Sequence, residues 1–459
     1  MAPRRRGAPR GRLRRHPLVC PDGPAGGRLV KVALVNPPWT FHGSVYLGCR
    51  EPHLPIELGY ARALLERAGH EAALIDAQAR GIDLIALRAE VAALRPAMTV
   101  IATAPSYLSW RSPPPELRVP MATAAALRGH GGLLVAVGPH GSATPRAALR
   151  KLGVDVVVLG ECEEILVMLA GATESRFWQI PSIAYRRNGI DHVQGGPYAA
   201  CLRTLPALRW DGATIARHVH HHHRFDAVPE GPSAEMETSR GSPCRCASCA
   251  RDGARDRLRK RPLATVLEEL DALLAEGVRH VYFIDERFLP DRTLLEEIWA
   301  RDIVFGVQLR IDSWSREMLD LLGRAGCVSI EASVDRPSIE GMDALARRCS
   351  ASTEELTALL VHARRSVPFV QANLSDAGSG DPAETASWRQ RLLGLGVWAN
   401  EPVPAFPYPG SPAYTRRWGA PDDGAWERAH AHYIAEHRTF GDLPDSRPLP
   451  LTELEHGAR

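Results

Sequence analysis

The sequence predicts a mixed α/β protein that holds an N-terminal doubly wound parallel sheet and a C-terminal partial (β/α)6 barrel. Short runs that are apolar throughout alternate with helical patterns in two separate stretches, and such runs are typical of parallel strands buried on both faces. The second stretch holds six β/α units in about 180 residues, whereas a closed eight-stranded barrel usually needs ~250. We therefore expect the barrel to be open.

Composition and charge exclude several classes of protein. The 459 residues are 45% hydrophobic and 24% charged, as in ordinary globular proteins, and no run reaches the ~18 apolar residues of a membrane helix. Seven arginines fall in the first fifteen residues of a chain with net charge +3, so the remainder is near neutral and carries no nucleic-acid footprint. Residues 1–28 lack the apolar core of a secretory signal. We expect a disordered leader and a cytoplasmic protein without membrane or nucleic-acid partners.

Residues 29–172 are expected to form the first domain. Its strands are expected at 31–35, 72–75, 99–104, 133–137 and 154–159, and its helices at 56–68, 84–94, 121–127 and 146–152. A doubly wound sheet binds ligands where its strands end. The candidates at these ends are Asn36, Pro37, Pro38, Thr103, Ser106, Gly138, His140, Gly160 and Glu161. No Gly-x-Gly-x-x-Gly motif follows the first strand, which argues against a nicotinamide dinucleotide.

Residues 173–232 are weakly patterned and are expected to be a linker with some local structure. The linker contains the histidines His218, His220, His221, His222 and His223. Imidazole is a common metal ligand, but a His-rich run is also typical of an exposed polar linker. Both interpretations stay open.

The second domain is expected over residues 233–410. Its strands are expected at 234–238, 278–284, 304–311, 328–334, 368–374 and 397–403, and its helices at 262–275, 294–300, 315–325, 352–363 and 384–395. Ser315 is a candidate helix N-cap, and Ser352 to Glu355 has the pattern of a capping box. Residues 411–459 form a C-terminal extension with one helix expected near 426–437.

Three of the nine cysteines, Cys244, Cys246 and Cys249, follow the first strand of this second domain. Clustered thiolates suit zinc or an iron–sulfur cluster, and nine cysteines are too few for a secreted disulfide scaffold. Zinc prefers four closed ligands. Three cysteines without a second nearby pair favour a cluster that leaves one iron open to a chelating substrate.

With this loop and the strand-end motifs, the chain resembles the cobalamin-binding radical S-adenosylmethionine (SAM) proteins from about Lys31 onward. In that family a Gly-Cys-Pro-x-x-Cys-x-x-Cys loop holds a 4Fe-4S cluster whose open iron binds SAM. Cys246 and Cys249 match the second and third cysteines of the motif, whereas Ser242 stands at the first and Cys244 comes two positions later. Either Cys244 completes the cluster, or Ser242 ligates it weakly, or no competent cluster forms, because thiolate binds iron far better than an alcohol does.

The resemblance also implies roles for residues at the strand ends. Asp285 and Glu286 correspond to the position that contacts the SAM amino group, Arg310 could pair with its carboxylate, and Glu331 could bind its ribose. Glu401 belongs to a segment that resembles the closing loop of the family, while Ser333 and Asp335 replace the usual Gly and Glu.

In the first domain the resemblance implies that the strand-end residues bind cobalamin. His140 is a candidate lower ligand of cobalt, although a loop histidine is more commonly hydrogen-bonded to backbone. The Asp-x-His-x-x-Gly motif that holds cobalt in some cobalamin domains is not present, because Gln78 occupies the histidine position.

The resemblance implies a cobalamin-dependent radical SAM enzyme that transfers a methyl group to an unactivated centre of a small-molecule substrate through a 5′-deoxyadenosyl radical. Its cofactors would be a 4Fe-4S cluster, SAM and cobalamin, and its partner an external electron donor of the flavodoxin or ferredoxin type. No catalytic residue is assigned by the sequence. The alternative is a degenerate, non-catalytic cobalamin-binding protein without a competent cluster, which Ser242 and Ser333 favour.

Overall fold

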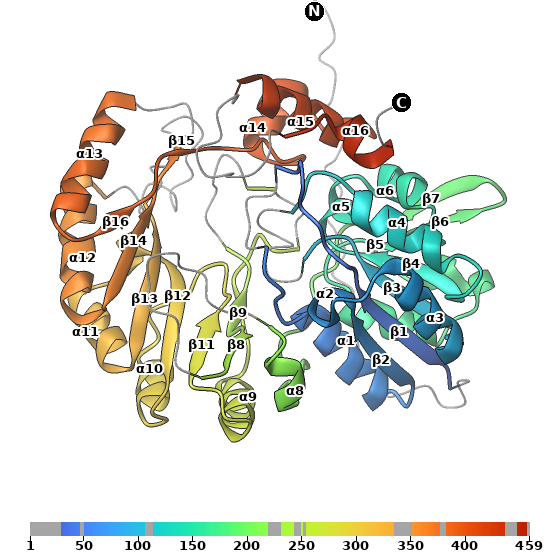
Figure 1. The fold of residues 1–459 in the computed structure, drawn as a ribbon, viewed down its shortest axis with the longest axis horizontal. Helices are drawn as coiled ribbons and strands as arrows, with labels where there is room; N and C mark the ends of the chain where they lie inside the picture. The colour runs from blue at the N-terminus through green and yellow to red at the C-terminus, as the bar shows by residue number, and fades with distance from the viewer. Residues whose placement is uncertain are drawn as a thin grey trace, which may run out of the picture.

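The computed structural model describes residues 29–45, 50–105, 113–218, 231–242, 249–250, 254–334, 351–376, 382–436 and 448–456. Its helices and strands form two large sheets, one mostly parallel and one parallel throughout, with their covering helices and a group of C-terminal helices above them (Figure 1). This is the α/β arrangement that the sequence predicts.

The first sheet has seven strands in the order β2-β1-β3-β4-β5-β6-β7. The strands are β1 (Lys31–Asn36), β2 (Glu71–Asp76), β3 (Met98–Ala102), β4 (Leu133–Val137), β5 (Val156–Val158), β6 (Ile183–Arg187) and β7 (Ile190–Gln194). β1 to β5 pair in parallel, with Val32 opposite both Ala72 and Met98. The apolar runs of β1 and β4 are continuous because both of their faces are covered.

The helices of this half are α1 (Ile56–Arg67), α2 (Ala77–Arg80), α3 (Leu84–Leu94), α4 (Arg118–Leu127), α5 (Pro139–Ala143), α6 (Pro145–Leu152) and α7 (Glu163–Ala170). One face of the sheet packs on α1 and α7, and the other on α3, α4 and α6. This confirms the doubly wound arrangement. α1 has two buried sides, because Leu58 and Leu65 pack on the first sheet while Ile56 and Tyr60 belong to the core of the second.

The first part of residues 173–232, which were expected to be a linker, differs from that expectation. Residues 183–194 form a hairpin that extends the first sheet, since β6 pairs antiparallel with β5 and with β7. Its turn, Asn188-Gly189, has φ of 52° and 75°, the left-handed pair of a two-residue hairpin turn. A 3-10 helix (Glu174–Gln179) precedes the hairpin and a short helix, α8 (Gly212–Ile215), follows it.

The second sheet has six strands that neighbour one another in chain order, and every pair is parallel. They are β8 (Ser233–Met236), β11 (His280–Phe283), β12 (Val304–Arg310), β13 (Cys327–Ser333), β14 (Phe369–Asn373) and β16 (Trp398–Ala399). Within the described part of the chain the two outer strands, β8 and β16, do not pair with each other. The barrel is therefore partial, as predicted.

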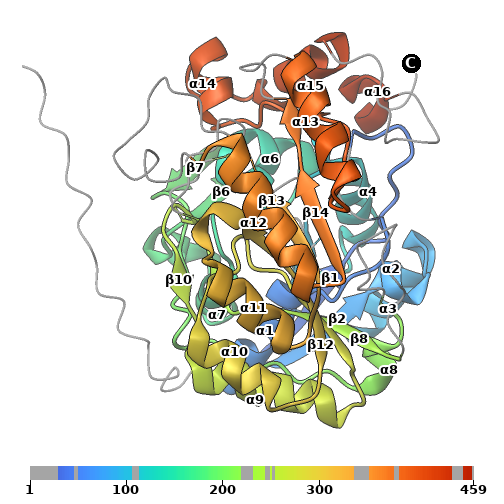
Figure 2. The same ribbon diagram turned by 90° about the vertical axis from the view of Figure 1, so that its left-hand side faces the viewer.

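Helices cover the outside of this partial barrel (Figure 2): α9 (Leu263–Ala275), α10 (Arg292–Trp299), α11 (Arg316–Arg324), α12 (Thr353–Ser366) and α13 (Pro382–Gly394). Ser315 and Ser352 cap α11 and α12, and Glu355 completes the expected capping box. Alternate strand residues such as Val281, Val307 and Ile330 join the apolar core beneath these helices. Their neighbours in sequence face the opposite side of the sheet, and many of them are polar.

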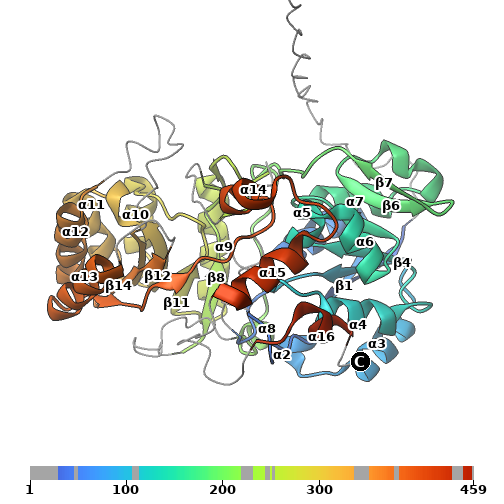
Figure 3. The same cartoon turned by 90° about the horizontal axis from the view of Figure 1, so that it is seen from above.

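The last strand expected at 397–403 is split, because β16 ends at Ala399 and β17 (Val403–Pro404) pairs instead with β15 (Ser375–Asp376). The chain then returns to the first sheet through α14 (Pro412–Trp418), α15 (Ala425–Glu436) and α16 (Leu451–His456), which lie along one side of the molecule (Figure 3). Trp426 of α15 packs on His140, with ring centroids 4.8 Å apart. None of the described helices is both long and apolar enough to cross a membrane.

Candidate functional site

The carboxyl end of β1 carries Asn36, whose buried side chain is fixed by two neighbours. Its Oδ1 accepts a hydrogen bond from Trp39 Nε1 at 2.8 Å, and its Nδ2 donates to Asp76 Oδ1 at 3.0 Å. Pro37, directly after the strand, accepts a backbone hydrogen bond from Trp39 at 2.9 Å. The ends of β1 and β2 are thereby held together.

The histidine run begins at His218, which belongs to the same network. Its Nε2 lies 2.9 Å from Asp76 Oδ2 and its Nδ1 lies 2.7 Å from the carbonyl oxygen of Thr214. Both ring nitrogens therefore have protein partners, which does not favour a metal at His218. The other four histidines of the run lie outside the described residues.

The end of β4 is shaped by Gly138 and His140. Gly138 has φ +134°, and a Cβ there would collide with the Thr103 hydroxyl. That hydroxyl lies 3.2 Å from His140 Nδ1, while His140 Nε2 lies 2.7 Å from the carbonyl oxygen of Pro114. Burial lowers the pKa of His140 to about 4, so the ring is neutral at pH 7. In this arrangement neither ring nitrogen is available to cobalt.

The end of β5 carries Gly160 and Glu161. Gly160 forms a bridge with Tyr198, and its N–H donates to Ser142 Oγ at 2.8 Å. Glu161 is buried and accepts hydrogen bonds from the backbone N–H of Ala200 at 2.7 Å and from Arg259 at 2.6 and 2.8 Å.

A pocket opens where these strands end. Four of the predicted residues line it: Asn36, Gly138, Gly160 and Glu161. The rest of the lining is formed by Pro55, Glu57, Leu58, Ala102, Ala104, Val137, Cys162 and Glu163. Thr103 lies against Gly138, and Ser106 falls outside the described residues. The structure thus gathers the ends of β1, β3, β4 and β5 around one space, as the rule for doubly wound sheets predicts.

The second set of predicted residues lies at the carboxyl edge of the second sheet. The parallel register sets Phe283 opposite Val307 and Arg310 opposite Ser333, so the strands end at one common edge. Asp285 and Glu401 follow β11 and β16, Arg310 ends β12, and Glu331 lies two residues before the end of β13, so the four lie toward that edge. Glu401 is exposed.

Asp285 is the most buried of this set, with 1% of its surface exposed. It accepts hydrogen bonds from Thr238 N at 2.6 Å, Thr238 Oγ1 at 2.5 Å and Ser239 Oγ at 2.6 Å. Burial raises the pKa of Asp285 to about 6, although these hydrogen bonds act in the opposite direction. The carboxylate therefore ties the end of β11 to the chain that leaves β8.

The other members of the set contact neighbouring polar groups. Glu331 accepts a hydrogen bond from Tyr282 Oη at 2.9 Å, and Arg310 pairs with Asp312 at 2.7 and 3.1 Å. Glu286 accepts a hydrogen bond from Arg255 Nη1 at 2.8 Å. These contacts hold the side chains at the same edge from which the sequence predicted SAM binding.

The cysteine segment, which is the chain between β9 and β10 (residues 241–258), begins and ends beside this edge. β9 (Ser239–Arg240) and β10 (Arg259–Lys260) pair antiparallel, and the backbone N–H of Ser242 donates to Arg255 O at 3.0 Å. Cys249 is exposed, whereas Cys244 and Cys246 lie outside the described residues. Among the residues that the structure describes, no group of three His, Cys, Asp or Glu side chains is arranged to hold a metal.

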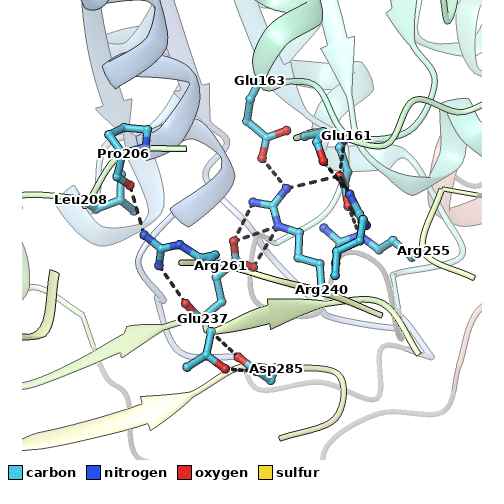
Figure 4. Close-up of polar contacts among 12 residues, drawn as sticks. Glu161, Glu163, Pro206, Leu208, Glu237, Arg240, Arg255, Arg261 and Asp285 are labelled. Atoms are coloured by element: carbon cyan, nitrogen blue, oxygen red, sulfur yellow. Dashed lines mark hydrogen bonds and ion pairs between the residues drawn. The ribbon is translucent and has the colours of Figure 1, made fainter. Parts of the chain in front are cut away.

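Sequence reasoning missed the buried charges around the base of this segment (Figure 4). Arg240 is 1% exposed and lies between Glu163 of α7 and Glu237. Arg261 pairs with Glu269 at 2.7 Å. The sequence Gly160-Glu161-Cys162-Glu163 after β5 was a visible signal for Glu161 and Glu163, but nothing local in the sequence identifies their arginine partners.

A second missed pair joins the two halves of the chain. His53 Nδ1 lies 2.6 Å from Glu235 Oε1, and both side chains are at most 3% exposed. Glu235 belongs to β8, on the side of the strand opposite to the apolar Ala234 and Met236. A charged residue inside a four-residue strand was the signal that could have indicated this contact.

No protein-family model matches the chain, and no curated protein matches it either. Solved structures do. The chain is similar to TsrM from Kitasatospora setae, a radical SAM methyltransferase with cobalamin and a [4Fe-4S] cluster bound, with a TM-score of 0.66 and 20% identity over 84% of this chain and 77% of that one. A second TsrM structure, with tryptophan substrate and the SAM analogue aza-SAM, gives a TM-score of 0.62 and 19% identity over 84% and 76%.

A third similar structure is the cobalamin-dependent SAM radical enzyme OxsB with aqua-cobalamin bound. Its TM-score is 0.60 at 16% identity, and the match covers 92% of this chain but 63% of the OxsB chain. All three matches include both sheets, because each covers more than four-fifths of the chain. The chain therefore has the fold of the cobalamin-dependent radical SAM enzymes.

Proposed function

We propose that this protein is a cobalamin-dependent radical SAM enzyme that methylates an unactivated centre of a small molecule. The observation that carries the proposal is the meeting of two strand-end sites. Glu161, which lines the pocket of the first sheet, pairs with Arg255 and Arg259 at the base of the cysteine segment. A methyl carrier in that pocket and a cluster on that segment would lie next to each other.

We place the corrinoid beside this pocket, at the strand ends. Gly138 and Gly160 have positive φ, and a Cβ on either would collide with Thr103 or Tyr198, so the two glycines let these strand ends pack closely. The pocket also has an apolar lining in Leu58 and Val137. When bound there, cobalamin would supply the methyl group. His140 would then hold the β4 end through Thr103 rather than ligate the metal.

The donor set fits an iron–sulfur cluster through Cys244, Cys246 and Cys249, because thiolates are the ligands that such clusters take. Cys244 is the candidate for the third ligand, because a thiolate binds iron far better than the Ser242 hydroxyl does. The cluster would supply the electron that cleaves SAM, delivered by a flavodoxin or ferredoxin type of donor.

Around SAM, this chain would supply carboxylates and one guanidinium. Asp285 and Glu286 would orient the amino group, Arg310 the carboxylate and Glu331 the ribose hydroxyls, since each can make a charge-assisted hydrogen bond to its partner. Glu401, on the last strand end, would close the site. The substrate would be a small molecule, as tryptophan is for TsrM.

The test is anaerobic reconstitution followed by assays of iron, sulfide and 5′-deoxyadenosine. We expect the wild type to take up iron and sulfide in the proportions of one cluster. Cys244→Ala should lose the iron–sulfur absorbance, whereas Ser242→Ala should leave it nearly unchanged. Ser242→Cys should raise the cluster occupancy. Cys201→Ala, which removes a thiol outside the segment, is the matched control. Hydroxocobalamin should co-elute with the protein in gel filtration. Corrinoid binding without iron in the wild type would instead indicate a non-catalytic cobalamin-binding protein, and retained iron in Cys244→Ala with loss in Ser242→Ala would make the serine the ligand.

A further inference from the structure

The acids of the Gly-Glu-Cys-Glu motif after β5 make unusual contacts for a ligand-binding loop. Glu161 is 1% exposed at its side chain and lies against Arg259 Nη2 at 2.6 Å and Arg255 Nε at 3.1 Å. Burial alone would raise the pKa of Glu161, but Arg240, Arg259 and Arg255 together lower it to about 2. With Ala200 N also bonded to it, both of its oxygens have partners from the protein.

Glu163, two residues later, makes the second contact. Its Oε1 lies 2.6 Å from Arg240 Nη1, and neither side chain is more than 1% exposed. On its other side Arg240 pairs with Glu237 at 2.8 Å, and its guanidinium lies 5.4 Å from the ring centre of Tyr60. Figure 4 shows Arg240 between these acids, which come from α7 and from the chain after β8.

The arginines that pair with these two acids, Arg240, Arg255 and Arg259, all lie at or next to the ends of the cysteine segment in the chain. Arg240 is the last described strand residue before the cysteines, while Arg255 and Arg259 come after them. Arg240 and Arg259 face each other in the β9–β10 pair. The two acids from the first sheet therefore hold the chain at both the entrance and the exit of the cysteine segment.

Arg255 carries the contact one step further. Its Nε faces Glu161, and its Nη1 donates to Glu286 at 2.8 Å. Glu161, Arg255 and Glu286 thus form a continuous ionic chain from the carboxyl end of β5 to the carboxyl end of β11. Such charges are expensive to desolvate, so their value lies in fixing a specific geometry more than in net stability.

We propose that Glu161 and Glu163 are positioning residues that clamp both ends of the cysteine segment to the carboxyl edge of the first sheet. The clamp sets where the base of that segment stands relative to the pocket beside Gly160. The part of this inference that concerns a cluster and a corrinoid rests on the proposed function, whereas the clamp itself does not.

The test is hydrogen exchange of the iron-free, full-length protein, followed by mass spectrometry. Peptides that cover residues 236–242 and 254–262 should exchange at least about tenfold faster in Glu161→Gln, a change that corresponds to ~1.4 kcal/mol of local opening. Glu163→Gln should act mainly on 236–242, since its partner is Arg240. Glu161→Asp, which keeps the charge, should restore most of the protection.

The matched control is Glu164→Gln. Glu164 is the neighbouring acid, but it accepts hydrogen bonds from Tyr198 Oη, from Cys201 N at 3.4 Å and from Thr204 Oγ1 at 3.2 Å, all on the first half of the chain. It should leave exchange in 254–262 at the wild-type rate. Equal exchange of that peptide in Glu161→Gln and Glu164→Gln would overturn the clamp. If Glu161→Gln fails to fold, Glu163→Gln against wild type decides instead, and unchanged exchange of 236–242 in that variant would refute the clamp.

A second measurement separates this inference from the proposed function. Hydroxocobalamin added to the wild type should slow exchange of residues 254–262 by several-fold, and this protection should vanish in Glu161→Gln even where the corrinoid still co-elutes. If the wild type binds no corrinoid, the proposed function fails while the comparison of unliganded variants still decides the clamp. If the corrinoid binds and protects 254–262 equally in both proteins, the clamp does not connect the two sites.

Discussion

Gly160→Ala should destabilise the first sheet strongly, because two independent costs meet at this residue. Gly160 has φ +80°, a conformation that costs an L-residue about 1–2 kcal/mol. A Cβ built there would also lie less than 3.0 Å from Tyr198 N, Tyr198 O and Pro197 C. These are backbone atoms that cannot rotate away, and overpacking of this kind costs about 1–3 kcal/mol. We expect a total loss of about 2–5 kcal/mol in the free energy of unfolding.

The matched control for this substitution is Gly129→Ala. Gly129 also has φ +80° and lies in the same half of the chain, but a Cβ there would meet no atom within 4 Å. It should lose only the conformational cost of about 1–2 kcal/mol. Urea denaturation followed by circular dichroism gives both values, and their difference isolates the collision with Tyr198. Equal losses in the two variants would refute the close approach of the β5 end to the chain at Tyr198.

Two further predictions concern the cover over the β4 end. The pKa of His140 is about 4 in the folded protein, whereas that of an unfolded histidine is near 6.5. The contribution of the neutral ring to the free energy of unfolding is therefore complete above pH 6.5 and is lost as the pH falls from 6.5 to 4. The loss of stability on acidification from pH 7 to 4 should therefore be about 3 kcal/mol smaller in His140→Gln, and parallel pH curves would contradict this. Trp426 is 5% exposed, and its Nε1 donates to Thr144 Oγ1 at 3.1 Å. Trp426→Ala should therefore lower the free energy of unfolding by about 3–5 kcal/mol. The control is Trp299→Ala, at a tryptophan that is 57% exposed, which should lower the free energy of unfolding by less than about 0.5 kcal/mol. Thermal melts compare the two variants, and a similar loss in both would mean that α15 does not pack on the β4 end.

The parts of the fold that the sequence predicted are those in which one strand or helix carries its own signal. Strands such as β1 and β4 are buried on both faces, so their apolar runs are visible without knowledge of any partner. Helices α11 and α12 begin at Ser315 and Ser352, whose side chains cap them locally. The gathering of predicted residues at the strand ends followed from topology alone, since parallel strands place their ends at one edge.

The β6–β7 hairpin was missed although Asn188-Gly189 is a strong hairpin signal. Its strands include Arg186, Arg187 and the exposed Ile190, so the alternation of polar and apolar residues is weak. The partners in the pairs of Glu161 with Arg259 and of His53 with Glu235 could not be predicted. The two members of each pair are far apart in the chain, and a charged residue does not show which opposite charge it will meet.

The buried charges between the two sheets need an explanation other than stability. Arg240 and Arg261 lie against Tyr60 of α1, a helix that also contributes residues to an apolar core on each of two sides. Apolar side chains of similar volume would fill such a site at no loss, and often with a gain of about 1–4 kcal/mol. An apolar contact would, however, tolerate sliding of one sheet against the other, because it has no preferred direction. Paired guanidinium and carboxylate groups accept one geometry only. We infer that the requirement met here is directional, since these paired groups fix one relative position of the two sheets.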